Sequence, residues 1–238
     1  MHRLDLAAWL DRKESQLRRV AERLGWPQGW LQEFIGFLGE PRMTFEEFWV
    51  RYTLLRLDAQ PLLKQTMTED EARLFYTTHD YMLWRNLVHR RHSAWRRVLW
   101  TMHRPQGKML EFGCGIAPVT SWVKKQRPGW TYNIQDIEGS SHLAYAEWRV
   151  QPAGPQPGYD VITALDVFEH LPEPLGDAKR LVSLLNFGGY LHWNFVGNSK
   201  RNDLDLASEE QQTETVDYLY KSLVLVWEST GYRVSQKR

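Results

Sequence analysis

The segment KMLEFGCGIAP, which begins at Lys108, constrains the fold more than any other part of the chain. A short apolar run ends in an acid and is followed by Gly113 and Gly115. Glycine lets the backbone turn sharply and lets a ligand approach the main-chain amides. Pro118 marks a helix start, because a proline's missing N–H would be unpaired at the first helical position anyway. The segment predicts a strand, a tight turn that can cradle a ligand, and a helix.

The residues after this turn alternate between helix-like and strand-like patterns. The expected helices are 118–126, 174–185 and about 208–229, and the further expected strands are 132–135, 159–165, 190–195 and 232–235. Strands that alternate with helices predict a parallel, doubly wound sheet. Such sheets bind ligands beyond the carboxyl ends of the strands, where the strand order reverses. Four candidate residues fall at strand ends: Gly113, Asp136, Leu165 and Asn194.

Three motifs in this region resemble those of the class I S-adenosylmethionine-dependent methyltransferases. Residues 111–115 resemble their first motif, E/D-x-G-x-G, and residues 159–174 resemble their fourth-strand signature. Residues 184–192 resemble their helix, Gly-Gly turn and fifth strand. The motifs occur in the family's order, and the resemblance covers residues 106–232. A nicotinamide dehydrogenase is the least favoured alternative, because Pro118 stands where G-x-G-x-x-G turns carry a third glycine.

The resemblance implies an α/β fold with a Rossmann-like, mostly parallel sheet and flanking helices, preceded by an all-helical N-terminal region. We expect the helical region over residues 1–105, as a cap on the acceptor side, and the methyltransferase domain over residues 106–238. The implied cofactor is S-adenosyl-L-methionine, with S-adenosyl-L-homocysteine (SAH) as the product.

The resemblance also implies cofactor-binding residues. They are Glu111, Phe112, Gly113, Cys114, Gly115, Asp136, Ile137, Leu165 and Asp166. Asp136 stands 21 residues past Gly115, about where a carboxylate holds ribose hydroxyls, with Glu138 as the alternative. Glu111 could instead cap a helix, Asp136 could be a turn acid, and a packing role suits Cys114 better than a nucleophilic one.

Catalytic and acceptor-binding residues are also expected. Glu169 and His170 follow the fourth-strand signature, and the ordinary pKa of histidine suits a general base near neutral pH. Transfer to an acceptor that is already nucleophilic needs mainly in-line placement, so a base is not obligatory. The candidates for acceptor contact are Tyr76, Tyr81, His192 and Asn194.

Two features depart from the family pattern. Only 22 residues separate Asp136 from Tyr159, and a Pro/Gly-rich turn at 152–158 occupies seven of them. The third strand should therefore be very short or absent, and the usual adenine-contacting acid after it has no counterpart. The chain also ends soon after the strand expected at 232–235, which leaves little for the family's antiparallel seventh strand.

The N-terminal 105 residues show helical signals. Apolar spacing predicts helices over 4–24 and 83–102. Capping boxes, in which a hydroxyl and a later Glu or Gln each accept from the other's main-chain amide, are expected at Thr44 and Thr68, and again at Ser208. A run without acids, 81–110, contains seven Lys or Arg. It could bind an anionic polymer, but a solvated or paired basic face is the preferred interpretation.

Composition excludes several classes of protein. The formal net charge of +1 gives no general attraction to nucleic acid or anionic membrane, and a single cysteine excludes a disulfide framework and a multi-cysteine zinc site. No metal site is expected. No apolar run reaches the length of a membrane span and no signal-peptide pattern is evident, so we expect a cytoplasmic protein without a membrane partner.

The sequence therefore predicts methyl transfer to an oxygen or nitrogen atom of a small molecule. The Asn-Pro-Pro-aromatic motif of many base-modifying enzymes is absent, and residues 193–196 read WNFV at that place. One alternative is a non-catalytic partner subunit that keeps the fold. Another is a methyltransferase that acts on RNA or an anionic polymer through the basic helix 85–97.

Overall fold

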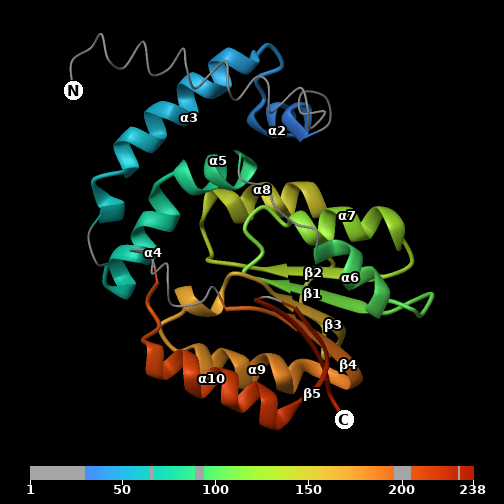
Figure 1. The fold of residues 1–238 in the computed structure, drawn as a ribbon. Coiled ribbons are helices and arrows are strands. Elements are labelled where there is room, and N and C mark those ends of the chain that lie inside the picture. The colour runs from blue at the N-terminus through green and yellow to red at the C-terminus, as the bar shows by residue number, and fades with distance from the viewer. Residues whose placement is uncertain (1–29, 65–66, 89–93, 196–204, 230) are drawn as a thin grey trace. The chain divides into compact units, whose positions relative to one another are not determined.

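The structure, a computed structural model, describes residues 30–64, 67–88, 94–195, 205–229 and 231–238 (Figure 1). The chain divides into two compact units, residues 1–58 and 59–238. The helix expected over 4–24 lies outside the described residues. The domain boundary expected near residue 105 remains a prediction.

The first unit contains α2 (Trp30–Leu38) and α3 (Phe45–Ala59), whose last residue crosses the boundary. The capping box expected at Thr44 is confirmed: its amide donates to Glu47 Oε2 at 2.7 Å, and the Glu47 amide donates to Thr44 Oγ1 at 3.2 Å. Phe34 and Phe48 are fully buried and pack edge to face, with 6.1 Å between ring centroids.

The second unit begins with a 3₁₀ turn (Leu62–Lys64), α4 (Glu69–Thr78), α5 (Tyr81–Val88) and α6 (Ala94–Thr101). The capping box at Thr68 is confirmed, because both of its hydrogen bonds with Glu71 are present. The single helix expected over 83–102 is described as two helices, and residues 89–93 between them are outside the description.

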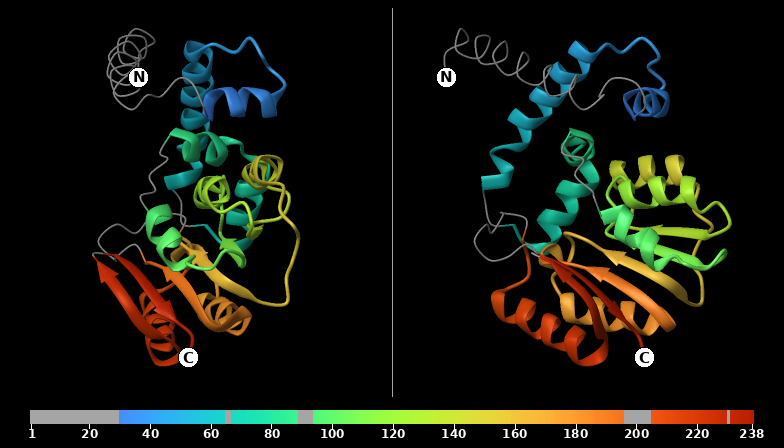
Figure 2. Two further views of the ribbon diagram at one scale, coloured as in Figure 1. Left: turned by 90° about the vertical axis from the view of Figure 1, so that its right-hand side faces the viewer. Right: turned by 45° about the vertical axis from the view of Figure 1, so that its right-hand side comes forward.

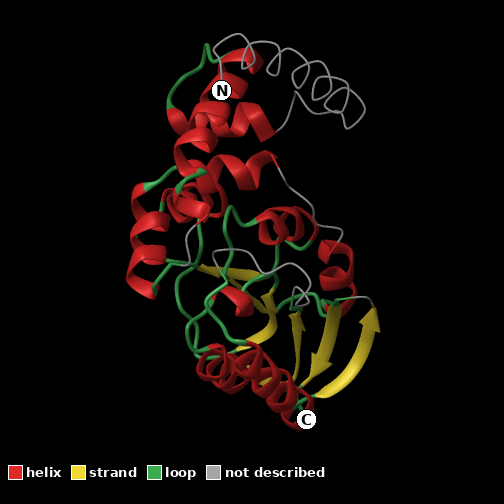
Figure 3. Cartoon of the chain, turned by 60° about the vertical axis from the view of Figure 1, so that its left-hand side comes forward, coloured by secondary structure: helices red, strands yellow, loops and turns green. Residues whose placement is uncertain are grey.

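A six-stranded sheet forms the centre of the second unit (Figure 3). Its strands are β1 (Lys108–Phe112), β2 (Thr131–Gln135), β3 (Tyr159–Ala164), β4 (Leu185–Trp193), β5 (Val224–Ser229) and β6 (Tyr232–Gln236), in the order β2-β1-β3-β4-β6-β5. The first four are parallel, whereas β6 is antiparallel to both β4 and β5. The expected fold class is confirmed.

Helices cover both faces of this sheet (Figures 1 and 2). One face carries α7 (Pro118–Gln126) and α8 (Ser141–Val150), and the other carries α9 (Pro174–Leu184) and α10 (Glu209–Ser222). Successive strand residues point to opposite faces, so Met109 joins the apolar cluster under α7 and α8 while Leu110 and Phe112 join the one under α9. The same alternation turns Glu111 toward α7.

The C-terminal part required a correction. The helix expected to reach Ser229 ends at Ser222, and residues 224–229 form β5. Valine, leucine and tryptophan dominate this segment and favour a strand once β6 supplies the pairing. The antiparallel strand that was expected to be missing is therefore present: it is β6, the strand expected at 232–235, and β5 lies beside it.

Two other strand expectations have mixed outcomes. Between Asp136 and Tyr159 the described chain contains α8 but no strand, which confirms the shortened sheet. β4 begins at Leu185 rather than Tyr190 and includes both glycines of the expected turn, with a register shift against β3.

No helix in the described part of the chain is long and apolar enough to cross a membrane.

Candidate active site

A cavity of about 580 Å³ opens at the carboxyl ends of β1, β2 and β3. This is the point where the strand order reverses, because β2 lies on one side of β1 and β3 on the other. The volume is in the range of small-molecule sites. The cavity is lined by Tyr76, Met82, Arg85, Asn86, Phe112, Gly113, Gly115, Gln135, Asp136, Ile137, His142, Asp166, Val167, Glu169, His170, Leu171, Asp177 and Arg180.

The turn after β1 borders the cavity with main chain rather than side chains. Gly113 has a φ of +63°, and a Cβ atom there would stand 2.2 Å from Val167 Cγ2. A Cβ on Gly115 (φ +51°) would stand 3.1 Å from the Asn86 side-chain nitrogen, so α5 closes over the turn. The structure thus shows why this turn requires glycine at Gly113.

Glu111 and Cys114 do not line the cavity. The Glu111 carboxylate accepts hydrogen bonds from the amides of Thr120 (2.7 Å) and Val119 (3.3 Å) at the start of α7. Burial raises the pKa of Glu111 to about 7, although these hydrogen bonds oppose the shift. This is the helix-capping arrangement that the sequence left open. Cys114 is buried behind the turn, which raises the pKa of its thiol.

Asp136 lines the cavity directly after β2. Its carboxylate accepts from the amides of Gly115 (2.7 Å) and Ile137 (2.8 Å) and bonds His142 Nε2 (2.9 Å). Burial alone would raise the pKa of Asp136, but the hydrogen bonds from His142 and the two amides hold it below its ordinary value. A carboxylate accepts about four hydrogen bonds, so this ionised group retains capacity for a ligand hydroxyl. Glu138, the alternative, is exposed and does not line the cavity.

His142 is a site residue that the sequence reasoning missed. Ser140 caps α8, with its hydroxyl accepting from the Leu143 amide at 3.3 Å, and this cap places His142 in the first turn, facing Asp136. The ring of Tyr76 meets His142 at 5.8 Å between centroids, almost perpendicular. The hydroxylated residue before the helix was the signal in the sequence that could have indicated this pair.

Glu169 and His170 lie together on a short 3₁₀ helix after β3 (Phe168–His170), and both line the cavity. Glu169 is 1% exposed, and neither carboxylate oxygen has a hydrogen-bond partner in the described part of the chain. Burial raises the pKa of Glu169 to about 7; His170 opposes the shift, and Asp166 and Asp205 add to it. His170 Nδ1 lies 3.1 Å from Asp205 Oδ1.

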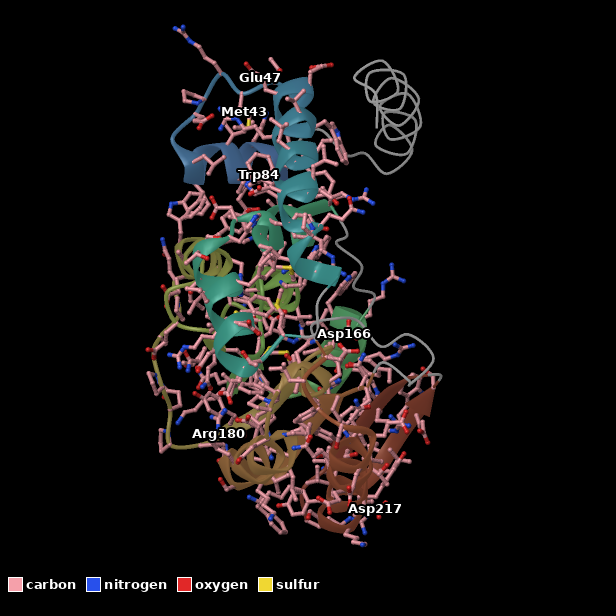
Figure 4. All side chains as sticks on the ribbon, turned by 90° about the vertical axis from the view of Figure 1, so that its left-hand side faces the viewer. Met43, Glu47, Trp84, Asp166, Arg180 and Asp217 are labelled. Carbon is pink, nitrogen blue, oxygen red and sulfur yellow. The ribbon has the colours of Figure 1, made fainter. Side chains whose placement is uncertain are left out.

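The remaining cofactor residues expected from the sequence occupy different positions. Phe112, Ile137 and Asp166 line the cavity, whereas Leu165 packs into the apolar clusters. Asp166, marked in Figure 4, has a left-handed φ of 54° and donates its amide to Asn194 Oδ1 at 2.6 Å. Asn194 is therefore behind Asp166 rather than in the cavity lining.

Two of the residues expected to contact the acceptor are core residues instead. His192 is fully buried between Thr101 Oγ1 (2.8 Å) and Tyr232 OH (2.7 Å), and burial lowers its pKa to about 3. The imidazole of His192 points toward α6 and β6 and does not line the cavity. Tyr81 is also buried and lies outside the lining, while Tyr76 lines the cavity as expected.

Several cavity residues were not expected at the site from the sequence. They are Met82, Arg85 and Asn86 on α5, Gln135 on β2, and Asp177 and Arg180 on α9. Among the described residues, no group of three or more His, Cys, Asp or Glu side chains is arranged to hold a metal ion.

The comparisons with known proteins agree with this architecture. A family model described as a methyltransferase domain matches residues 83–235, which is more than half of the chain. No functionally curated protein shows significant similarity to the sequence.

Several solved structures are similar. Magnesium protoporphyrin IX methyltransferase from Synechocystis, with bound SAH, has a TM-score of 0.50 and 15% identity, covering 71% of this chain and 98% of that one. An O-methyltransferase family protein from Burkholderia thailandensis has a TM-score of 0.49 and 14% identity, and the match covers 93% of this chain and 87% of that one. A TehB-like methyltransferase from Corynebacterium glutamicum has a TM-score of 0.46 and 18% identity, and the match covers 65% of this chain and 94% of that one.

Together, the strand order, the glycine turn beside a cavity of cofactor size and the family match lead to one assignment. The chain belongs to the methyltransferase domain family and is an S-adenosyl-L-methionine-dependent methyltransferase with the class I, Rossmann-like fold.

Proposed function

We propose that this enzyme transfers a methyl group from S-adenosyl-L-methionine to an oxygen or nitrogen atom of a small-molecule acceptor. The observation that supports this most is that the glycine turn, Asp136 and Glu169 line the same cavity. Its volume of about 580 Å³ has room for a cofactor and a compact acceptor. We further propose that the enzyme is cytoplasmic.

Each group has a defined task in this proposal. When bound, the cofactor supplies an electrophilic methyl group on a sulfonium ion. The Gly113 turn offers main-chain groups at close range, and Asp136 accepts hydrogen bonds from the ribose hydroxyls. Glu169 would receive the proton that the acceptor atom loses when it is methylated. A buried carboxylate with a raised pKa is suited to receive that proton near neutral pH.

The two alternatives lose specific support. The partner-subunit hypothesis drew on a shortened sheet and on the basic helix. The sheet lacks a strand between Asp136 and Tyr159 in the described chain, but its antiparallel strand, β6, is present. The RNA hypothesis relied on the basic run, yet Arg85 lines the cavity and Arg97 stacks on Trp227 and Tyr232, at 4.2 and 4.9 Å from their ring centroids. Salt-dependent binding of RNA that weakens after removal of Arg96, which is exposed, would restore the second alternative.

The test is calorimetric titration with S-adenosyl-L-methionine and SAH, beside NAD. We expect micromolar binding of both adenosyl ligands and none of NAD. Asp136→Ala should weaken binding at least about tenfold, because hydrogen bonds to a charged group are lost. Glu138→Ala, the matched control two residues further on, should bind as the wild type does. If Asp136→Ala bound the adenosyl ligands as tightly as the wild type does, the assignment of Asp136 to the ribose hydroxyls would be refuted. A screen of candidate acceptors that measures SAH release then tests turnover.

A further inference from the structure

Two arginines line the cavity, and their surroundings differ. Arg180 on α9 (Figure 4) donates to Asp177 Oδ1 through Nη2 (3.0 Å) and Nε (3.3 Å), and to Gln135 Oε1 through Nη1 (3.2 Å). Its guanidinium also lies over the Phe112 ring, 5.0 Å from the centroid. Arg85 on α5 is half-buried, and its guanidinium forms no ion pair or hydrogen bond with the described residues.

The two arginines reach the cavity from different elements, Arg85 from α5 and Arg180 from α9. Asn86, beside Arg85, reaches Gly115, so α5 borders the glycine turn. Gln135 follows Ile134, which packs under α7 and α8, so strand alternation turns Gln135 to the α9 face, where Arg180 bonds it. Asp136 connects the two regions, because its carboxylate accepts from the Gly115 amide and its chain neighbour is Gln135.

The chemistry of the cofactor distinguishes the two arginines. Its methionine part carries a carboxylate, and its adenine is planar and uncharged. A carboxylate pairs best with a guanidinium whose charge is not already neutralised, which describes Arg85. A guanidinium already paired with a carboxylate still offers a planar face for stacking, and its partner can accept from an exocyclic amine, which describes Arg180 and Asp177.

We infer that the cofactor lies with its methionine carboxylate at Arg85 and its adenine against Arg180, Asp177 and Gln135. This inference rests on the proposed function. It also explains how the enzyme recognises adenine without a strand between Asp136 and Tyr159: α9 and the end of β2 provide the contacts.

The test compares SAH with S-adenosyl-3-thiopropylamine, which lacks only the carboxylate. Calorimetry gives the dissociation constant of each ligand, and the measured quantity is their ratio. In the wild type the truncated ligand should bind at least about tenfold more weakly, because a hydrogen-bonded charge pair is lost. Arg85→Gln should weaken the binding of SAH by a similar factor, so that the ratio of the two dissociation constants falls close to one. Arg85→Lys, which keeps the positive charge, should retain part of the discrimination.

Arg180→Gln is the matched control, because it removes the other cavity arginine. It should weaken the binding of both ligands by the same factor and leave the ratio of their dissociation constants unchanged. An unchanged ratio in Arg85→Gln, or a ratio near one in Arg180→Gln, would overturn the inference. A raised acceptor KM in Arg85→Gln with unchanged SAH affinity would also overturn it. If the folded wild type binds neither ligand, the proposed function itself fails, so the two failures can be distinguished.

Discussion

At the scale of single residues, the surroundings of Glu169 disfavour a charged carboxylate. It is 1% exposed, both of its oxygens lack hydrogen-bond partners in the described chain, and Asp166 and Asp205 add negative charge nearby. His170 and the residue's own main chain oppose the rise in the pKa of Glu169. Burying an ionised carboxylate in this way is unfavourable, so the group binds a proton more readily than a free glutamate does.

This environment predicts a pH-dependent stability. The pKa of Glu169 is about 7 in the folded protein against 4.5 in its reference state, so its contribution to the free energy of unfolding is fully present below pH 4.5 and is lost as the pH rises to 7. The loss is about 1.4 kcal/mol for each pH unit in that window. Glu169→Gln removes the titration. The difference in Tm, variant minus wild type, should therefore be more positive at pH 8 than at pH 5.

Thermal unfolding at both pH values measures this difference. Glu138→Gln, at an exposed position, serves as the control and should show the same difference at both. Equal differences at pH 5 and pH 8 for Glu169→Gln would contradict the raised pKa.

At the scale of elements, the capping boxes show how local spacing starts a helix at the cavity. Glu71 Oε2 accepts from the Thr68 amide at 2.8 Å, and Thr68 Oγ1 accepts from the Glu71 amide at 3.3 Å. These contacts fix the start of α4, which carries Tyr76 to the cavity wall. A residue pair three positions apart thus helps to place a side chain of the site.

Thr68→Ala should lower the free energy of unfolding by about 1 kcal/mol, because an amide of the first turn of α4 loses its acceptor. Denaturant unfolding measures the change. Thr78→Ala is the matched control: it makes the same substitution in the last residue of α4, where the hydroxyl donates to the Leu74 carbonyl and caps no amide. A loss as large in Thr78→Ala would show that the effect does not come from the cap.

At the scale of the whole second unit, His192 connects three elements. It lies on β4 and bonds Thr101 at the end of α6 and Tyr232 at the start of β6. Arg97 of α6 stacks on Tyr232 and on Trp227 of β5. These contacts attach the helix that leads into β1 to the far edge of the sheet, which the order of elements along the chain does not reveal.

The buried imidazole predicts sensitivity to acid. The pKa of His192 is lowered from 6.5 to about 3, so its contribution to stability is present above pH 6.5 and is lost as the pH falls through this range, because the unfolded chain binds the proton first. The loss is about 1.4 kcal/mol per pH unit. His192→Gln should lose less stability than the wild type between pH 7 and pH 5. Glu169 and Glu111 shift stability in the opposite direction between pH 4.5 and 7, so the comparison must be made between variant and wild type.

Denaturant unfolding at pH 7 and pH 5 gives the four free energies that this comparison needs. His103→Gln, at an exposed position, is the control and should follow the wild type. The same acid loss in His192→Gln as in the wild type would refute the role of the buried ring.

The sequence by itself determined the features that depend on spacing within a few residues. It predicted the glycine turn, the bounds of α7 at Pro118 and Gln126, and the three capping boxes, all of which the structure contains. Turn, cap and strand alternation are local properties, so their residues need no distant partner to be recognised. The short interval between Asp136 and Tyr159 likewise predicted a very short or absent strand, and the described chain has none there.

Only the tertiary structure decided which side chains meet. Residues 224–229 became a strand because β6 pairs with them, and Glu111 turned to α7 because of its place in the pleat. The approach of Arg85 and Arg180 to one cavity from helices far apart in the sequence depends on how those helices pack on the sheet. Pairing and packing between distant segments follow from the folded arrangement as a whole, and no short pattern in the sequence encodes them.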